Sequence, residues 1–219
     1  MIRMEYDGHL LEFDTDKRLF SPSKIDIGTL AMLSKVEFHT NDKILDLGCG
    51  YGVVGIVAGK TIGGYNVVMS DISDKAINWA KHNAIKNKLN EIRIIQSNGY
   101  ESIPDRDFSL ILSNPPYHSN FSLAKEFIEE GFKRIVLGGR MIMVTKRKEW
   151  YKNKFISVFG GVIIFEVDGY YVFIAEKRNL SSTKKTGKNK GQLSKKLMRK
   201  HARITGKKQH TYKVKVYNL

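Results

Sequence analysis

Short apolar runs alternate with segments of helical periodicity along most of this chain. Runs of five or six residues predict strands at 43–47, 66–71, 92–96, 108–113 and 139–144. Apolar residues at helical spacing predict helices over 74–89 and 122–136. Near the end of this pattern, two further apolar runs, 161–167 and 170–175, flank Asp168-Gly169, which is a strong β-hairpin signal.

The order of these elements predicts the fold class. Strands that alternate with helices are joined by right-handed crossovers, which give a mostly parallel sheet with helices on both faces. The closing hairpin adds an antiparallel pair. We therefore expect an α/β fold with a mostly parallel seven-stranded sheet that ends in a C-terminal antiparallel hairpin.

The positive charge of the chain is concentrated at one end. Residues 178–219 contain 14 Lys and Arg and no acidic residue, so the remaining 23 basic and 22 acidic residues of the chain nearly balance. This asymmetry favours a polyanionic partner, most often nucleic acid. We predict a folded domain over 1–177 and a basic C-terminal extension over 178–219, in which 212–216 alternates like a short strand.

The composition also excludes several classes of protein. A single cysteine rules out an internal disulfide framework and a Cys-based zinc cluster, and the six histidines lack metal-ligand spacing, so we expect no metal. No apolar run approaches the ~18 residues of a membrane span, and the first residues lack the apolar core of a signal peptide. We expect a cytoplasmic protein without a membrane partner, and no motif specifies its oligomeric state.

A glycine-rich turn follows the first predicted strand. The segment 46–52 reads Asp-Leu-Gly-Cys-Gly-Tyr-Gly and precedes a helix that opens at Val53. Glycines allow a tight turn and the close approach of a ligand, and Asp71, which ends the second strand, suits ribose hydroxyls. The glycine spacing differs from the dinucleotide pattern and no phosphate-loop lysine follows. These features favour a ligand with a ribose and no phosphate; the alternative is a purely structural turn.

A second motif, Asn-Pro-Pro-Tyr at 114–117, ends the fourth predicted strand. Asn114 offers a side-chain carbonyl and Pro115 a backbone carbonyl, so two acceptors could converge on one amine. Tyr117 offers a face on which a planar base could stack. Since the carboxyl ends of parallel strands face the ligand crevice, both motifs are expected at one site. The alternative is a proline-stiffened loop with an exposed aromatic ring.

With these motifs, residues 10–177 resemble a class I S-adenosylmethionine (SAM)-dependent methyltransferase of the small-domain type. That type includes the 16S ribosomal RNA guanine-N2 methyltransferases. The resemblance rests on four segments: Phe-Ser…Asp-Ile-Gly-Thr within 20–29, the glycine turn 46–52, Ser-Asp-Ile-Ser at 70–73, and Ser-Asn-Pro-Pro-Tyr-His at 113–118. It implies a Rossmann-like methyltransferase fold, SAM as the cofactor and RNA as the partner.

The resemblance also implies roles for individual residues. The residues expected to bind the cofactor are Phe20, Ser21, Thr29, Asp46, Gly48, Gly50, Gly52, Asp71, Ile72 and Asn98. Among these, Asp71 would bind the ribose, Ile72 would pack on the adenine, and Thr29 would help to close the pocket. Asn98 stands where these enzymes usually place an Asp that accepts from the adenine amino group.

The catalytic residues implied are Asn114, Pro115 and Tyr117, which would hold the target amine and stack the base. The residues expected to contact the substrate RNA are Pro116, His118, Lys146, Lys195, Lys196, Arg199, Lys200 and Arg203. Many members of the group carry a second, related N-terminal half, whereas 19 residues precede Phe20 here. We therefore expect the basic extension to take part in substrate binding.

The predicted reaction is methylation of an exocyclic amine of a nucleobase in RNA, with guanine N2 in ribosomal RNA favoured. Three alternatives remain open at this point. They are methylation of adenine N6 in RNA or DNA, methylation of a glutamine amide in a protein, and a non-catalytic RNA-binding module on the same fold.

Overall fold

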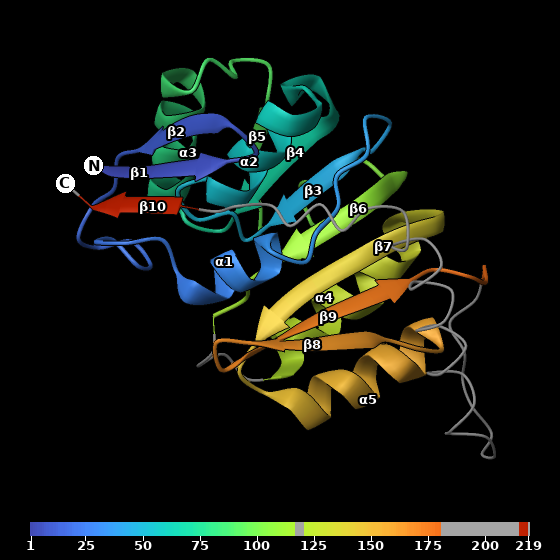
Figure 1. Cartoon of the computed structure of the whole chain (residues 1–219). Coiled ribbons are helices and arrows are strands. Elements are labelled where there is room, and N and C mark those ends of the chain that lie inside the picture. The colour runs from blue at the N-terminus through green and yellow to red at the C-terminus, as the bar shows by residue number, and fades with distance from the viewer. Residues whose placement is uncertain (117–120, 181–214, 219) are drawn as a thin grey trace.

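A seven-stranded sheet organises the part of the chain that the computed structural model describes, which is residues 1–116, 121–180 and the backbone of 215–218. Its strands are β3 (Ile44–Leu47), β4 (Val67–Asp71), β5 (Arg93–Gln96), β6 (Phe108–Ser113), β7 (Ile135–Thr145), β8 (Ile163–Val167) and β9 (Tyr170–Glu176). They lie in the order β5-β4-β3-β6-β7-β9-β8 (Figure 1). The five strands from β5 to β7 are parallel, and β9 and β8 are antiparallel, which confirms the predicted fold class.

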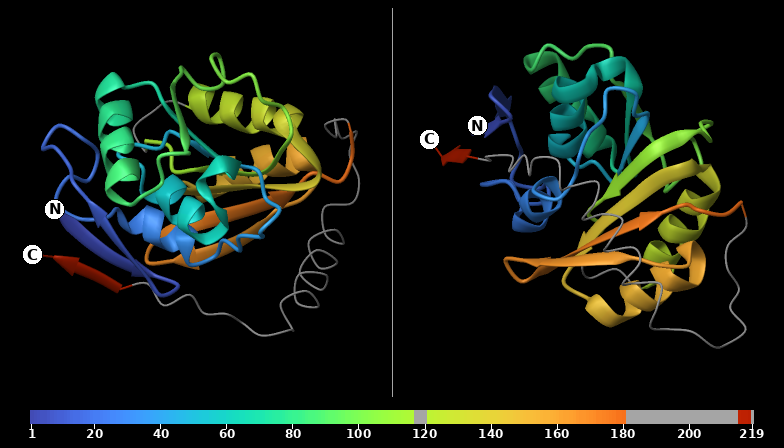
Figure 2. Two further views of the ribbon diagram at one scale, coloured as in Figure 1. Left: turned by 90° about the horizontal axis from the view of Figure 1, so that it is seen from above. Right: turned by 45° about the vertical axis from the view of Figure 1, so that its right-hand side comes forward.

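Helices cover both faces of this sheet (Figure 2). They are α1 (Ile27–Leu33), α2 (Val53–Ile62), α3 (Asp74–Lys86), α4 (Phe121–Arg134) and α5 (Lys148–Phe159), and a 3₁₀ turn, η1 (Gly64–Asn66), precedes β4. One apolar core joins α1, α2 and α3 to one face, and a second joins α4 and α5 to the other. Side chains alternate along β3, so Ile44 enters the first core and Leu45 the second. None of the helices in the described ranges is long and apolar enough to cross a membrane.

The predicted boundary between α4 and β7 is wrong by several residues. The helix was expected to reach 136 and the strand to begin at 139, but α4 ends at Arg134 and β7 begins at Ile135. Ile135 pairs with Phe108, and the register then shifts so that Arg140 pairs with Leu110. Gly138, with φ 82°, lies in this irregular stretch. The early pairing of Ile135 with β6 therefore outweighs the helical pattern that continues through the sequence.

An N-terminal hairpin was not predicted from the sequence. β1 (Ile2–Tyr6) and β2 (His9–Phe13) pair around Asp7-Gly8, whose φ angles are 49° and 80°. Asp168-Gly169 turns β8 into β9 with nearly the same angles, 49° and 76°, so both dipeptides fit the turn type that favours Asp-Gly. The hairpin packs its buried residues into the core that contains α1 and α2.

The C-terminal end of the basic extension joins this hairpin. β10 (Lys215–Asn218) pairs with β1 in antiparallel fashion and completes a three-stranded sheet of order β10-β1-β2 (Figure 1). The strand expected at 212–216 overlaps β10 at 215–216, and 212–214 lie outside the described residues. The division of the chain into 1–177 and 178–219 remains a prediction.

Candidate functional site

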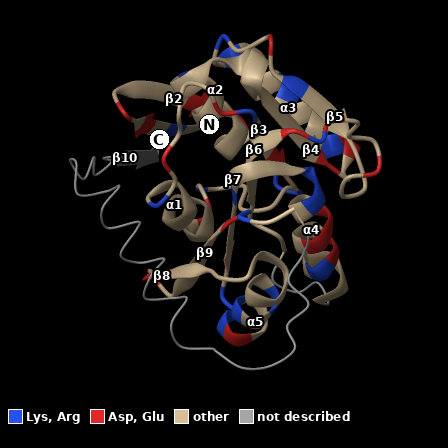
Figure 3. Ribbon diagram, turned by 90° about the vertical axis from the view of Figure 1, so that its right-hand side faces the viewer, with Lys and Arg blue, Asp and Glu red and all other residues tan. Residues whose placement is uncertain are grey.

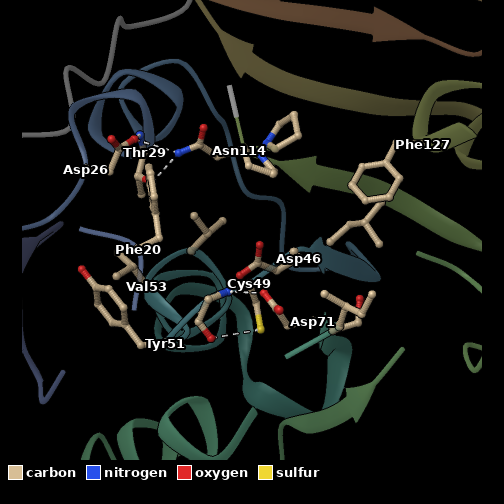
Figure 4. A pocket seen from close by; sticks show the side chains of 18 of the residues that line it. Phe20, Asp26, Thr29, Asp46, Cys49, Tyr51, Val53, Asp71, Asn114 and Phe127 are labelled. Atoms are coloured by element: carbon tan, nitrogen blue, oxygen red, sulfur yellow. Dashed lines mark hydrogen bonds between the residues drawn. The ribbon is translucent and has the colours of Figure 1, made fainter. Parts of the chain in front are cut away.

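A cavity of about 300 Å³ opens where β3, β4, β5 and β6 end (Figure 4). Most of the predicted site residues line it: Phe20, Ser21, Thr29, Asp46, Gly48, Gly50, Asp71, Ile72, Asn98, Asn114, Pro115 and Pro116. The structure thus brings the glycine turn and the Asn-Pro-Pro segment to one cavity, as the parallel sheet requires. Their individual roles remain predictions.

Other predicted residues lie elsewhere. Gly52 is the N-cap residue of α2, and a side chain there would meet Ile56 rather than the cavity. Lys146 follows β7 and is exposed. The remaining predicted residues fall outside the described ranges: Tyr117, His118, Lys195, Lys196, Arg199, Lys200 and Arg203.

The backbone of the glycine turn requires glycine. The φ angles of Gly48, Gly50 and Gly52 are 76°, 56° and 97°, in the left-handed region that side chains disfavour. The Gly48 and Cys49 N–H groups donate to the Ser70 carbonyl at 2.8 and 2.9 Å, which folds the turn over the end of β4. Apart from the adjoining residues of the chain, no described atom lies within 4 Å of where a Cβ on Gly48 or Gly50 would stand, so open space borders this turn.

Asp71 is fixed by two backbone groups at the edge of the cavity. Its Oδ2 accepts from the Gly50 N–H and its Oδ1 from the Ser73 N–H, both at 2.9 Å. Each carboxylate oxygen can accept a second hydrogen bond, so the group can also receive hydroxyls of a ligand. Asn98 also lines the cavity, and its amide nitrogen donates to Glu101 at 3.1 Å. The side-chain carbonyl oxygen of Asn98 is then the atom that could accept a hydrogen bond from a ligand.

Asp46 is a buried carboxylate in the same cavity. Its Oδ2 accepts from the Gly55 N–H at 2.8 Å. Burial is the main cause that raises the pKa of Asp46, the Gly55 N–H lowers it, the charge of Asp71 raises it, and together they place it at about 7. A cation bound in the cavity would stabilise the ionised form, because an opposite charge favours a buried carboxylate.

Two further observations point to a ligand with both polar and planar parts. Ser70 lines the cavity, and its hydroxyl is buried and has no hydrogen-bond partner among the described residues. Buried polar groups are usually paired, so this oxygen is an unsatisfied polar group at the wall of the cavity. Ile72 and Phe20 also line the cavity, yet they are 64% and 53% exposed, which leaves apolar surface for a ring to cover.

Asn114 is held by the segment that begins α1 (Figure 4). Its amide nitrogen donates to Asp26 Oδ2 at 2.8 Å and to Thr29 Oγ1 at 3.0 Å. Asp26 is also the N-cap residue of α1, because the same Oδ2 accepts from the Thr29 N–H at 3.0 Å. Thr29, expected to close the cofactor pocket, therefore also contacts the predicted catalytic amide.

Sequence reasoning missed part of the lining. Asp26 stands inside the 20–29 segment, where an acid three residues before Thr29 is an N-cap signal. Most of the other lining residues without an assigned role are apolar and come from separate elements: Ile25, Leu47, Tyr51, Val53, Val54, Leu123 and Phe127. Their spacing matches ordinary core residues, so no local signal marks them.

Basic residues follow β7 at the same edge of the sheet. β7 pairs with β6 through Met143 and Ser113, so residues 146–148 follow β7 on the side where Asn114 follows β6. All three are exposed, and lysines continue along α5 (blue at α5 in Figure 3). The charged group of each of the three residues at 146–148 lies 4.8 to 4.9 Å from the centre of an aromatic ring: Lys146 Nζ over Tyr170, Arg147 Cζ over Phe121 and Lys148 Nζ over Tyr171.

Comparison with known families identifies the domain. Residues 10–174 match the family model described as methyltransferase small domain. The chain belongs to this family. The resemblance drawn from the motifs is thereby confirmed.

In the described ranges, no group of three or more His, Cys, Asp or Glu side chains could hold a metal ion.

Two relatives of this chain are named as methyltransferases of ribosomal RNA. Ribosomal RNA small subunit methyltransferase C of Serratia proteamaculans is 31% identical over 170 residues, which cover 76% of this chain and 48% of that protein. Ribosomal RNA large subunit methyltransferase G of Alteromonas mediterranea is 28% identical over 178 residues, which cover 76% of this chain and 43% of that protein. The chain thus spans about half the length of both relatives.

A solved structure shares the fold. It is the T. thermophilus 16S rRNA N2 G1207 methyltransferase in complex with AdoMet and guanosine, with a TM-score of 0.70 and 23% identity. The similarity covers 81% of this chain and 51% of that one. At this identity the likeness shows the fold of the methyltransferase domain.

Proposed function

We propose that this chain is a SAM-dependent methyltransferase that modifies an exocyclic amine of a nucleobase in RNA, with guanine N2 in ribosomal RNA as the target. One observation carries the proposal: the Asn114-Pro115 acceptors share a single cavity with the glycine turn and Asp71. A nucleoside-type ligand and an amine can therefore meet in one place. The family and the names of the relatives support methyl transfer to ribosomal RNA, and we propose a cytoplasmic site of action.

The residues present fit SAM. Asp71 would accept from the ribose hydroxyls, and the exposed side chain of Ile72 would pack against the adenine. Asn98 would offer its carbonyl oxygen to the adenine amino group. Asp46, buried and able to ionise near neutral pH, would face the ammonium of the methionine end. When bound, SAM supplies an electrophilic methyl group carried on a sulfonium.

The chemistry left to the protein is to hold and orient the amine. The lone pair of an exocyclic nitrogen is delocalised into the base, which makes it a poor nucleophile. Hydrogen bonds from its two N–H groups to Asn114 Oδ1 and the Pro115 carbonyl would favour a pyramidal nitrogen with a free lone pair. Ideal positioning of this kind can contribute about 7–11 kcal/mol. The carbonyl dipoles also stabilise positive charge that develops on the nitrogen.

The RNA would approach from the side of the sheet where β7 ends. Lys146 and its two basic neighbours lie at that edge, and the basic extension supplies further cations for phosphates. A base in a helix must leave its stack to reach the Asn114 loop, as for other enzymes that act on bases. Tyr117 would then stack on the base, a contact worth about 1–3 kcal/mol.

The proposal is tested by methyl transfer from labelled SAM to a panel of acceptors. We expect label in small-subunit ribosomal RNA or particles and little label in transfer RNA or DNA. The large-subunit RNA belongs in the panel because one relative modifies it by name. Label in a protein and in none of the nucleic acids would contradict the proposal.

SAM affinity should depend on pH through Asp46. The ionised form of this group attracts the ammonium of SAM, and its pKa of about 7 means that ionisation rises across neutral pH. Between pH 5.0 and 6.5, below the range in which α-amino groups deprotonate, affinity should rise by up to about 20-fold. Calorimetric titration measures it. Asp46→Asn should bind with a nearly flat pH profile; an unchanged slope in that variant would remove Asp46 from the interaction.

A further inference from the structure

We infer that Asp26 is a positioning residue for methyl transfer: its carboxylate orients the Asn114 amide so that the carbonyl oxygen, and not the nitrogen, meets the substrate amine. The inference rests on the proposed function for its meaning, since it assigns a role at the same site. Asp26 lines the cavity and lies 2.8 Å from the Asn114 amide nitrogen through Oδ2.

The orientation of an amide needs such a device. The two ends of an Asn side chain have nearly the same shape, but one donates and the other accepts. A substrate amine offers N–H groups, so only the oxygen of Asn114 can serve it. The Asn114 amide nitrogen donates to Asp26 and to Thr29 at the start of α1. If the amide were flipped, its oxygen would face the Asp26 carboxylate, which has no hydrogen to donate. The contact with Asp26 therefore fixes the nitrogen at α1.

The support for Asn114 is itself rigid. Asp26 Oδ2 receives the Thr29 N–H as well as the Asn114 amide, so the start of α1 and the amide are tied to one atom. The side chain of Thr29 is mostly buried, which holds its hydroxyl in place. Binding sites keep their geometry when their residues are supported by neighbours of this kind.

The carboxylate also gives Asn114 an electronic bias. A hydrogen bond from the amide nitrogen to a charged acceptor is stronger than one to a neutral group. It draws the amide toward its polar resonance form, which places more negative charge on the carbonyl oxygen. That charge would lie beside the nitrogen on which positive charge develops during transfer. The role of Asp26 is exerted through Asn114 and involves no proton transfer or covalent bond of its own.

Three variants at position 26 separate positioning from helix capping. Asp26→Ala removes both the cap and the acceptor. Asp26→Gly removes the acceptor but keeps a residue that is well tolerated at an N-cap. Asp26→Asn keeps an oxygen that can accept from both N–H groups. We expect alanine and glycine to lower the single-turnover rate by about 100-fold, as for a small misplacement of a catalytic group, and asparagine, which keeps the acceptor but not the charge, to lower it by no more than about tenfold.

Affinities decide whether the loss is one of positioning. The dissociation constants for SAM and for RNA should stay within about twofold in all three variants, because the role concerns the reacting amine. If glycine restored the wild-type rate, helix capping would explain the loss in alanine and the inference would be wrong. A parallel fall in SAM affinity would equally contradict it.

A second readout does not need activity. The Asn114 side-chain NH₂ signals, assigned in ¹⁵N-labelled protein by their loss in Asn114→Ala, should exchange slowly with water. Exchange should become faster in Asp26→Ala and Asp26→Gly, and stay slow in Asp26→Asn. Fast exchange in the wild-type protein would overturn the inference. Absence of methyl transfer by the wild-type protein to any RNA would instead contradict the proposed function and leave this test intact.

Discussion

Asn114→Ala should lower the rate of methyl transfer by about 10²–10³-fold while the affinity for SAM stays within about twofold. This loss of rate is the size found when an enzyme loses one hydrogen-bonding group that stabilises the charge developing in the transition state. The truncated side chain leaves the substrate amine with Pro115 as its single acceptor. Single-turnover kinetics with labelled SAM, together with calorimetric titration, measure both quantities.

The matched control for this variant is Asn66→Ala. Asn66 is exposed in η1, which precedes β4 at the opposite edge of the sheet from the cavity. Its replacement removes the same side chain and should change neither the rate nor the affinity. If Asn114→Ala lost SAM binding in parallel with turnover, the separation of an amine-binding loop from a cofactor pocket would be wrong.

Asp71→Ala should show the opposite behaviour, with SAM affinity about 100-fold weaker. Hydrogen bonds to a charged acceptor contribute about 1.5–3 kcal/mol each, and the proposed ribose contacts would be lost. The substitution also frees the N–H groups of Gly50 and Ser73, which now donate to this carboxylate, so the glycine turn loses part of its support. Titration with SAM in the absence of RNA isolates the effect.

Asp107→Ala serves as the control for that loss. Asp107 is an exposed acid that pairs with Lys43 beside the start of β6, at the far edge of the sheet. The variant removes the same charge from the protein and should bind SAM normally. Equal weakening in both variants would mean that overall charge, and not a contact at the end of β4, controls affinity.

The fold could be predicted where local signals agree with the tertiary structure. Buried parallel strands are short apolar runs, and Asp168-Gly169 marks the final hairpin because both residues adopt positive φ. The N-terminal hairpin carries the same Asp-Gly signal at Asp7-Gly8 and could have been predicted in the same way. The start of β7 at Ile135 could not, because it depends on pairing with Phe108, which helical periodicity does not record.

The candidate site divides in the same manner. The glycine turn and the Asn114 loop could be predicted because each is a local motif, and the parallel sheet brings their strand ends together. The contact between Asp26 and Asn114 spans 88 positions in the chain and links α1 to the end of β6. No periodicity or spacing indicates such a pair. The raised pKa of Asp46 likewise depends on burial that only the folded chain provides.

The central claim is that the Asn114 loop presents two acceptors to the amine of a guanine in ribosomal RNA. Small-subunit RNA labelled by this protein can be digested to nucleosides and the methylated product identified by mass spectrometry. The account predicts N2-methylguanosine, at a level that falls with Asn114→Ala. A product methylated on a ring nitrogen, a carbon or a ribose hydroxyl would contradict it, because none of these atoms is an exocyclic amine; N6-methyladenosine would retain the amine chemistry and overturn the choice of base.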